Sequence, residues 1–256
     1  MAAPCFLSKP AITNIVGYQN VPVAPGYSCF TATFKNIADG DIDLNTLVAA
    51  KADGTAFATS GRTGTCAGKI SIQKLSSDGS YGAVYAYYST KTPIGWYDNA
   101  TGLAVANGAV TFANGEGFAI YNGLTESATV LTSGAVDLVC KNAIATGYSI
   151  MGNSTPVSID LTSVKCLKSD GTDFATSGRT GTCAGKISIQ KLSADGSYGT
   201  VYAFYSTKSP AGWYDNSTGT AVAAGDVVLP AGTAFALNNT LGETAILQLP
   251  SPIAAE

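Results

Sequence analysis

The chain has 256 residues, of which 46% are hydrophobic and only 12% are charged, and its formal net charge is −3. It contains no histidine, which excludes Ser-His-Asp and Cys-His catalysis, imidazole acid–base chemistry and histidine-ligated metal sites. The weakly acidic balance also argues against nucleic acid as a partner, because such binding rests on a basic surface. An inventory rich in glycine and tyrosine, with 29 and 13 residues, favours strands joined by tight turns over helices.

The first 15 residues are expected to form an N-terminal arm. The arm contains Cys5 and Phe6 within an apolar segment, and a thiol beside an apolar plug suits docking against a neighbouring subunit or against the chain's own fold. It has no basic stretch followed by a long apolar core, and no apolar run elsewhere approaches the length of a membrane-spanning helix. The sequence therefore predicts neither an export signal nor a membrane partner.

A tandem repeat organises most of the chain. Residues 54–99 and 171–216 are identical at 40 of 46 positions, at an offset of 117 residues that also relates Ile42 to Ile159. So many shared side chains specify one fold rather than two. We expect two copies of one β domain, over residues 16–134 and 135–256, with the junction near Ser133-Gly134, where the pattern is interrupted.

Within each copy, hydrophobic and polar residues alternate with the period of a β-strand. In the first copy, residues 69–73 alternate, Asp78-Gly79 supplies a turn and residues 81–90 form a tyrosine-rich strand, so this segment and its counterpart predict hairpins. Asn107-Gly108 stands between alternating segments and predicts another hairpin. Further strands are expected at 118–121 and 128–131. About seven short strands per copy predict an all-β chain of two tandem homologous β-sandwich or small β-barrel domains.

The segment from Gly61 to Lys69, repeated at residues 178–186, looks at first like a phosphate-binding loop. However, only three residues separate Gly64 from Gly68 instead of four, Ile70 stands where a serine or threonine would bind magnesium, and a strand follows instead of a helix. We therefore expect a glycine-rich connection between strands, with no cofactor. Its arginines, Arg62 and Arg179, are candidates for contacts with backbone carbonyls or with a neighbouring subunit.

Aromatic residues cluster at the same place in both copies, and such a cluster would suit a stacking platform for sugar rings. Because alternate residues of a strand face opposite sides, most of them must belong to the core, and packing is the main expectation. The members that we single out as candidates for interface or ligand contact are Trp96, Tyr97, Trp213 and Tyr214. Asp98, next along the chain, is expected to bond the backbone of a turn.

The six cysteines are too widely spaced for a zinc site, so no metal is expected. They are all candidates for disulfides within or between chains in an oxidising setting: Cys5, Cys29, Cys66, Cys140, Cys166 and Cys183. Without histidine no cysteine has an activating base, and the carboxylates of Asp78 and Asp195 lie in ordinary Asp-Gly turns. The sequence therefore predicts no catalytic residue.

Several segments together resemble the β-rich repeats of uncharacterised bacterial surface proteins and of phage structural proteins. They are VGYQNVPVAPGYSCFTATF near the N-terminus, KISIQKL followed by a Gly-Ser-Tyr strand, GWYDN, and VTFANGEGFAIYN. The resemblance covers most of the chain because both copies carry it. It implies a role in assembly or display at an outer surface, with no catalytic residues to transfer.

We therefore expect a non-enzymatic structural component of an extracellular assembly, and within that class a phage virion protein of the capsid-decoration or fibre type. Its location is then the virion, which needs no export signal because phage particles assemble in the cytoplasm and leave by lysis. Its partners are further copies of the chain or other virion proteins, and a surface with few charges and many tyrosines suits such interfaces. The alternatives are a cell-surface adhesin or carbohydrate-binding module that contacts surface glycans outside the cell, and a self-assembling filament subunit.

Overall fold

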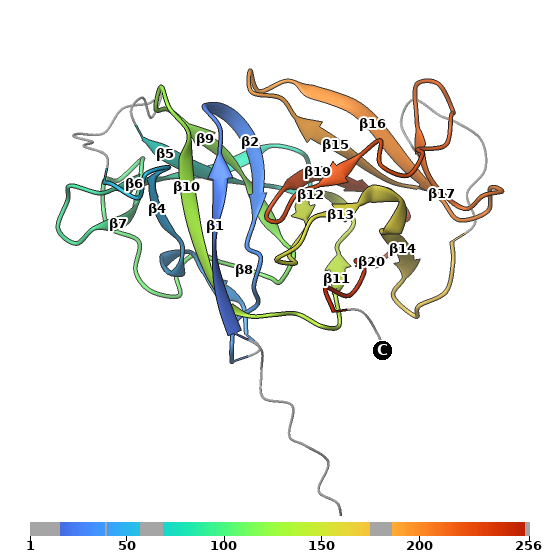
Figure 1. Cartoon of the computed structure of the whole chain (residues 1–256), viewed down its shortest axis with the longest axis horizontal. Coiled ribbons are helices and arrows are strands. Elements are labelled where there is room, and N and C mark those ends of the chain that lie inside the picture. The colour runs from blue at the N-terminus through green and yellow to red at the C-terminus, as the bar shows by residue number, and fades with distance from the viewer. Residues whose placement is uncertain (1–15, 39, 57–68, 175–185, 254–256) are drawn as a thin grey trace, which may run out of the picture.

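The computed structural model describes residues 16–38, 40–56, 69–174 and 186–253. These residues form small antiparallel sheets arranged in a ring, like the four blades of a propeller, and contain no α-helix (Figure 1). The prediction of an all-β chain with little helix is confirmed.

The first repeat supplies ten of the described strands. They are β1 (Val16–Val23), β2 (Gly26–Thr31), β3 (Ile42–Asp43), β4 (Val48–Lys51), β5 (Ile70–Leu75), β6 (Tyr81–Tyr88), β7 (Gly95–Asp98), β8 (Thr111–Phe112), β9 (Gly117–Asn122) and β10 (Ala128–Ala135). A single 3₁₀ turn, η1 (Leu44–Thr46), follows β3, and the Asp43 carboxylate caps it by accepting a hydrogen bond from the backbone N–H of Asn45.

The second repeat supplies the other ten described strands. They are β11 (Lys141–Ile144), β12 (Gly147–Gly152), β13 (Ile159–Asp160), β14 (Lys165–Lys168), β15 (Ile187–Leu192), β16 (Tyr198–Tyr205), β17 (Gly212–Asp215), β18 (Val228–Leu229), β19 (Ala234–Asn239) and β20 (Ala245–Gln248). Its 3₁₀ turn is η2 (Leu161–Ser163), capped in the same way by Asp160.

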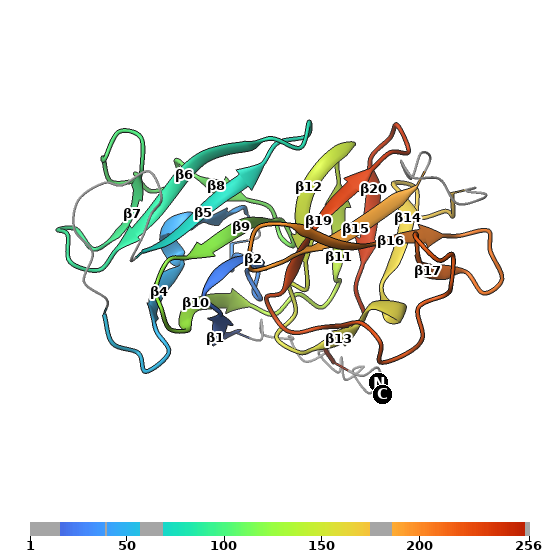
Figure 2. The ribbon, with the colours of Figure 1, turned by 90° about the horizontal axis from the view of Figure 1, so that it is seen from above.

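Both repeats arrange their strands in the same order. The first has a five-stranded sheet, β2-β9-β5-β6-β7, a three-stranded sheet, β1-β10-β4, and the pair β3-β8. The second has β12-β19-β15-β16-β17, β11-β20-β14 and β13-β18. Figures 1 and 2 show the first repeat, in blue to green, beside the second, in yellow to red.

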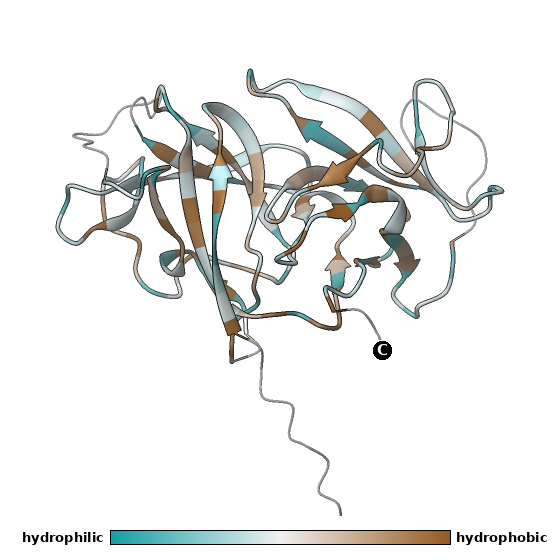
Figure 3. Ribbon diagram, viewed as in Figure 1, coloured by the Kyte–Doolittle hydropathy of each residue, from teal (hydrophilic) through white to brown (hydrophobic). Residues whose placement is uncertain are grey.

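The core of each repeat joins its five-stranded sheet to its three-stranded sheet. In the first repeat, Phe30, Ile72 and Phe118 of the larger sheet are buried with Val21 and Val130 of the smaller one. Buried residues alternate with less buried ones along β10 from Ala128 to Gly134, and Figure 3 shows the hydrophobic residues of the sheets in brown. The period-two pattern of the sequence therefore corresponds to the faces of these strands.

The tyrosine-rich hairpin lies where the sequence predicts it. β5 and β6 pair antiparallel, with Ile70 opposite Tyr87, and β15 pairs with β16 in the same register. The turn closes through a 2.8 Å hydrogen bond from the N–H of Gly79 to the carbonyl of Ser76. Gly79 has a φ of +87°, which explains the glycine of the Asp-Gly signal.

The hairpin predicted at Asn107-Gly108 is wrong, although the turn itself is present. The turn closes from the N–H of Ala109 to the carbonyl of Ala106 at 3.1 Å, but its two flanks pair with different partners: Ala104 bridges to Tyr97, and β8 pairs with β3. Tertiary contacts fix this arrangement, because the Asp43 carboxylate accepts the N–H of Gly108 at 2.8 Å.

The interruption expected at Ser133-Gly134 is also absent. β10 runs through both residues to Ala135 and stays paired with β1. Gly134 is needed for another reason: a Cβ there would collide with the carbonyl oxygen of Lys35. The glycine lets the two backbones approach closely. Directly after it, Ala135 forms an isolated β-bridge with Lys35.

The repeats differ in one loop. Gly147, which begins β12, lies 121 residues after Gly26, which begins β2, whereas β13 lies 117 residues after β3. The first repeat is therefore four residues longer between these strands, in the segment that carries Lys35 and Ile37. Because this segment lies against β10, the insertion supports the extra length of β1 and β10.

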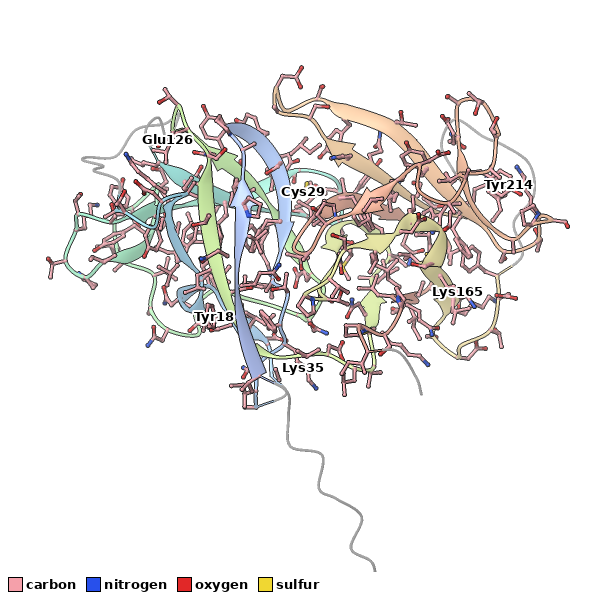
Figure 4. The ribbon with its side chains drawn as sticks, in the orientation of Figure 1. Tyr18, Cys29, Lys35, Glu126, Lys165 and Tyr214 are labelled. Carbon is pink, nitrogen blue, oxygen red and sulfur yellow. The ribbon has the colours of Figure 1, made fainter. Side chains whose placement is uncertain are left out.

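The two repeats meet through the outer faces of their five-stranded sheets. Cys29 and Ala119 of the first repeat are buried against Ile150, Leu192 and Ala234 of the second. Figure 4 shows Cys29 between the two halves of the molecule. We call this contact the repeat junction.

Equivalent residues exchange equivalent bonds across the repeat junction. The N–H of Tyr27 donates to the carbonyl of Ala194 at 2.9 Å, and the N–H of Tyr148 donates to the carbonyl of Ser77 at the same distance. The hydroxyls of Tyr81 and Tyr198, which are 117 residues apart, lie 2.6 Å from each other. The two repeats are thus related like the subunits of a two-fold dimer.

Candidate interaction surface

An exposed apolar patch lies at the free edge of β1. β1 stands at the end of the sheet β1-β10-β4, so in the described part of the chain only one of its two edges is paired. Val16, Tyr18 and Ile37 are 60%, 78% and 59% exposed. We call these three residues and the outer edge of β1 the edge patch.

The edge patch surrounds a hollow of about 540 Å³, whose lining also includes Lys35 and Gly134. In Figure 4, Tyr18 and Lys35 are labelled along the lower half of β1 and beside its lower end. β1 carries no charged residue over its whole length. Natural proteins usually protect an edge strand with charge, proline, a bulge or a covering segment, so the uncharged part of β1 that precedes Pro22 is suited to pair with another strand.

The second repeat does not reproduce the edge patch. Its corresponding strand, β11, has four residues instead of eight and begins with Lys141. The residues before it form a connection in which the carboxylate of Asp137 accepts hydrogen bonds from Asn114 at 2.7 Å and from the N–H of Val139 at 3.0 Å. The patch therefore belongs to the first repeat alone.

The aromatic residues singled out from the sequence lie in the packed interior. Trp96 and Trp213 are each 2% exposed, and Tyr97 and Tyr214 are each 6% exposed. The indole N–H of Trp96 donates to the carbonyl of Leu47 at 2.9 Å. The structure therefore favours packing over a sugar-stacking platform for these four residues.

In each repeat two buried tyrosines form a small cluster apart from the main core, and a lysine lies over both rings. The sequence did not reveal this arrangement. Lys91 Nζ lies 3.9 Å from the ring centre of Tyr88 and 4.3 Å from that of Tyr97. Buried Lys69 donates to the Tyr88 hydroxyl at 2.8 Å. Lys208 lies over Tyr205 and Tyr214 in the same way. The only sequence signal was the shared lysine near each GWYDN segment, and these cation–π contacts occupy ring faces that a sugar would need.

The carboxylates of the turn aspartates accept hydrogen bonds from backbone N–H groups of their own turns, as predicted. Asp98 accepts the N–H of Ala100 at 2.7 Å. Hydrogen bonds from Ser80 lower the pKa of Asp78, and hydrogen bonds from Ser197 lower the pKa of Asp195. A general acid needs a raised pKa, so the environment of these two carboxylates does not suit one.

Three of the cysteines are buried free thiols: Cys29, Cys140 and Cys166. None of them is bonded to another described cysteine, so the structure gives no disulfide at these three positions. The other candidates named from the sequence lie outside the described residues: Cys5, Cys66, Cys183, Phe6, Arg62 and Arg179.

Among the described residues, no three histidine, cysteine, aspartate or glutamate side chains gather closely enough to hold a metal ion. The described part of the chain also has no helix with the length and apolar character needed to cross a bilayer. Comparisons with protein-family models, curated proteins and solved structures each found no match.

Proposed function

We propose that this chain is a non-enzymatic structural component of an extracellular assembly, and specifically a phage virion protein of the capsid-decoration or fibre type. The edge patch is the observation that carries the proposal. It combines a strand edge that no other described strand pairs with and exposed apolar side chains, and both are features of surfaces that bind other protein chains.

The two repeats support the same proposal. Each repeat joins a five-stranded to a three-stranded sheet through a single core, and we interpret each pair of sheets as the two layers of a β-sandwich. A sandwich is a rigid unit, and two such units joined at the repeat junction would present a fixed surface to neighbours in an assembly. The partners are further copies of this chain or other virion proteins, and the N-terminal arm remains a candidate tie between subunits.

Light scattering of the purified chain tests the assembly role. We expect the wild-type chain to self-associate and the double variant Val16→Lys/Tyr18→Lys to be a monomer, because two lysines on an edge strand oppose strand pairing. Leu103→Lys is the control, since Leu103 is 69% exposed and lies outside the edge patch. The Leu103 variant should associate like the wild type.

Mass spectrometry of purified particles tests the virion assignment. The chain should be present in stoichiometric amounts, and the edge-patch variant should be depleted from particles while the Leu103 variant is incorporated. A monomeric wild-type chain that is also absent from particles would contradict the proposal.

A further inference from the structure

The lysine that follows the Ile-Gln pair of the tyrosine hairpin has different surroundings in the two repeats. In the first repeat, Lys74 Nζ lies 2.9 Å from a carboxylate oxygen of Glu116 and donates to the carbonyl of Thr111 at 2.6 Å. The other carboxylate oxygen of Glu116 accepts the N–H of Ala113 at 2.8 Å. The lysine is therefore neutralised by an acidic group of its own repeat.

The second repeat has lost both parts of this arrangement. Lys191 is the counterpart of Lys74, but Thr233 stands in place of Glu116, and Pro230, which has no N–H, stands in place of Ala113. Lys191 is exposed, and its side-chain ammonium makes no ion pair or hydrogen bond to any residue that the structure describes. Its ammonium is a cation without the carboxylate that the first repeat supplies.

Lys191 lines a cavity of about 550 Å³. Its lining includes apolar residues that keep some exposure, Val227 and Val228, above the buried Ile189 and Phe235, and it also includes Thr200 and Tyr202. Lys191 and Thr233 also line a smaller hollow of about 200 Å³ that reaches Val21 and Val23 of the first repeat. Cavities of a few hundred Å³ with apolar walls and few polar groups are typical of small-molecule sites.

We propose that this cavity binds a small molecule with an apolar body and a single carboxylate. The carboxylate pairs with Lys191 as Glu116 pairs with Lys74, and the apolar body lies against Val227 and Val228. Pairing an ammonium with a carboxylate at the edge of an apolar wall gives a charge-assisted contact that an uncharged analogue lacks.

Asp226 restricts the ligand further. Its carboxylate lines the same cavity and accepts the N–H of Ala223 at 3.2 Å. A second negative charge on the ligand would be repelled by it. The site therefore prefers a monocarboxylate to a dicarboxylate of the same length.

Calorimetric titration of the full chain with octanoate, octanamide and octanedioate tests this inference. Octanoate should bind at one site per chain, and both analogues should bind at least about tenfold more weakly. Octanoate that fails to bind at about 10 mM, or that binds no better than octanamide, would overturn the proposal.

Three variants test whether octanoate binds in this cavity or binds non-specifically elsewhere on the chain. Lys191→Gln should weaken octanoate binding at least about tenfold, and Thr233→Glu should do the same by placing a carboxylate of the chain beside Lys191. Lys74→Gln is the matched control in the first repeat and should leave binding unchanged. If Lys74→Gln weakens binding as much as Lys191→Gln does, or if neither Lys191→Gln nor Thr233→Glu weakens it, the cavity is not the site. Circular dichroism of each variant verifies the fold.

Discussion

At the scale of single residues, burial at the repeat junction controls the chemistry of Cys29. Burial raises the pKa of this thiol to about 12, and a hydrogen bond with the backbone of Leu192 offsets only part of the effect. Burial likewise raises the pKa of Cys140 to about 11 and that of Cys166 well above its ordinary value. The thiolate is the reactive form, so these three side chains act at neutral pH as small apolar residues.

We expect the free energy of unfolding to fall as the pH rises above about 9, because an unfolded cysteine loses its proton there. The folded chain keeps the Cys29 proton up to about pH 12, so between these values the folded state binds more protons and loses up to about 1.4 kcal/mol per pH unit. Below about pH 9 both states are protonated, and the contribution of this thiol to stability is fully present.

Urea unfolding at several pH values between about 7 and 10.5 measures this slope. Cys29→Ala removes one of these titrating thiols and should give a shallower decline than the wild type. Parallel declines in the two proteins would show that Cys29 does not titrate as the structure implies.

At the scale of elements, a buried asparagine holds β9 to the loop that follows it and to the neighbouring sheet. Asn122 is 1% exposed, and its side-chain amide donates to the carbonyl of Val23 at 3.0 Å and to that of Glu126 at 2.9 Å. Its oxygen accepts the N–H of Leu124 at 3.0 Å. Asn239 repeats the pattern with Ile144, Glu243 and Leu241.

Asn122→Leu should destabilise the chain by about 2–4 kcal/mol, because it leaves two carbonyls and an N–H without their partners in a buried place. Asn239→Leu should have an effect of similar size, since its side chain makes the same three bonds in the second repeat. Chemical denaturation measures both free energies. A change below about 0.5 kcal/mol in either variant, the range of ordinary surface substitutions, would contradict this role.

The elements that the sequence predicted are those set by local signals. Alternation and Asp78-Gly79 located the β5-β6 hairpin because a strand face and a turn depend on neighbouring residues. The hairpin predicted at Asn107-Gly108 was wrong because Asp43, 65 residues away, binds that turn and the flanks of the turn pair with other strands. The interruption predicted at Gly134 was wrong because the sequence cannot distinguish a glycine that ends a strand from one that lets the backbone of Lys35 approach closely.

The candidate surfaces were harder to predict for the same reason. The exposed state of Tyr18 depends on which strand lies at a sheet edge, and that is a property of the assembled sheet. The difference between Lys74 and Lys191 was visible in the sequence as the replacement of Glu116 by Thr233, but only the ion pair between Lys74 and Glu116 in the structure shows why that replacement matters.

The burial of Trp96 and Tyr97 agrees with the packing that strand alternation favoured.

At the scale of the whole molecule, the repeat junction makes the two repeats one structural unit. Gly26 is central to it, because its φ of +90° and the closeness of the Ala194 carbonyl both exclude a side chain. Gly147 occupies the same place opposite Ser77. Together with the buried contact between Cys29 and Ile150, these close approaches couple the unfolding of one repeat to that of the other.

We therefore expect the wild-type chain to unfold in one calorimetric transition, with a ratio of calorimetric to van't Hoff enthalpy near about 1. Gly26→Ala should lower the free energy of unfolding by about 2–5 kcal/mol, because alanine is strained in a left-handed conformation and its side chain overpacks the repeat junction. It should also raise the ratio of calorimetric to van't Hoff enthalpy towards about 2, because the repeats then unfold separately. Gly54→Ala is the control: Gly54 has a φ of +80° and nothing within 4 Å of its added Cβ, so it should cost only about 1–2 kcal/mol and keep a single transition. Two transitions in the wild type, or the same response to both substitutions, would mean that the junction does not couple the repeats.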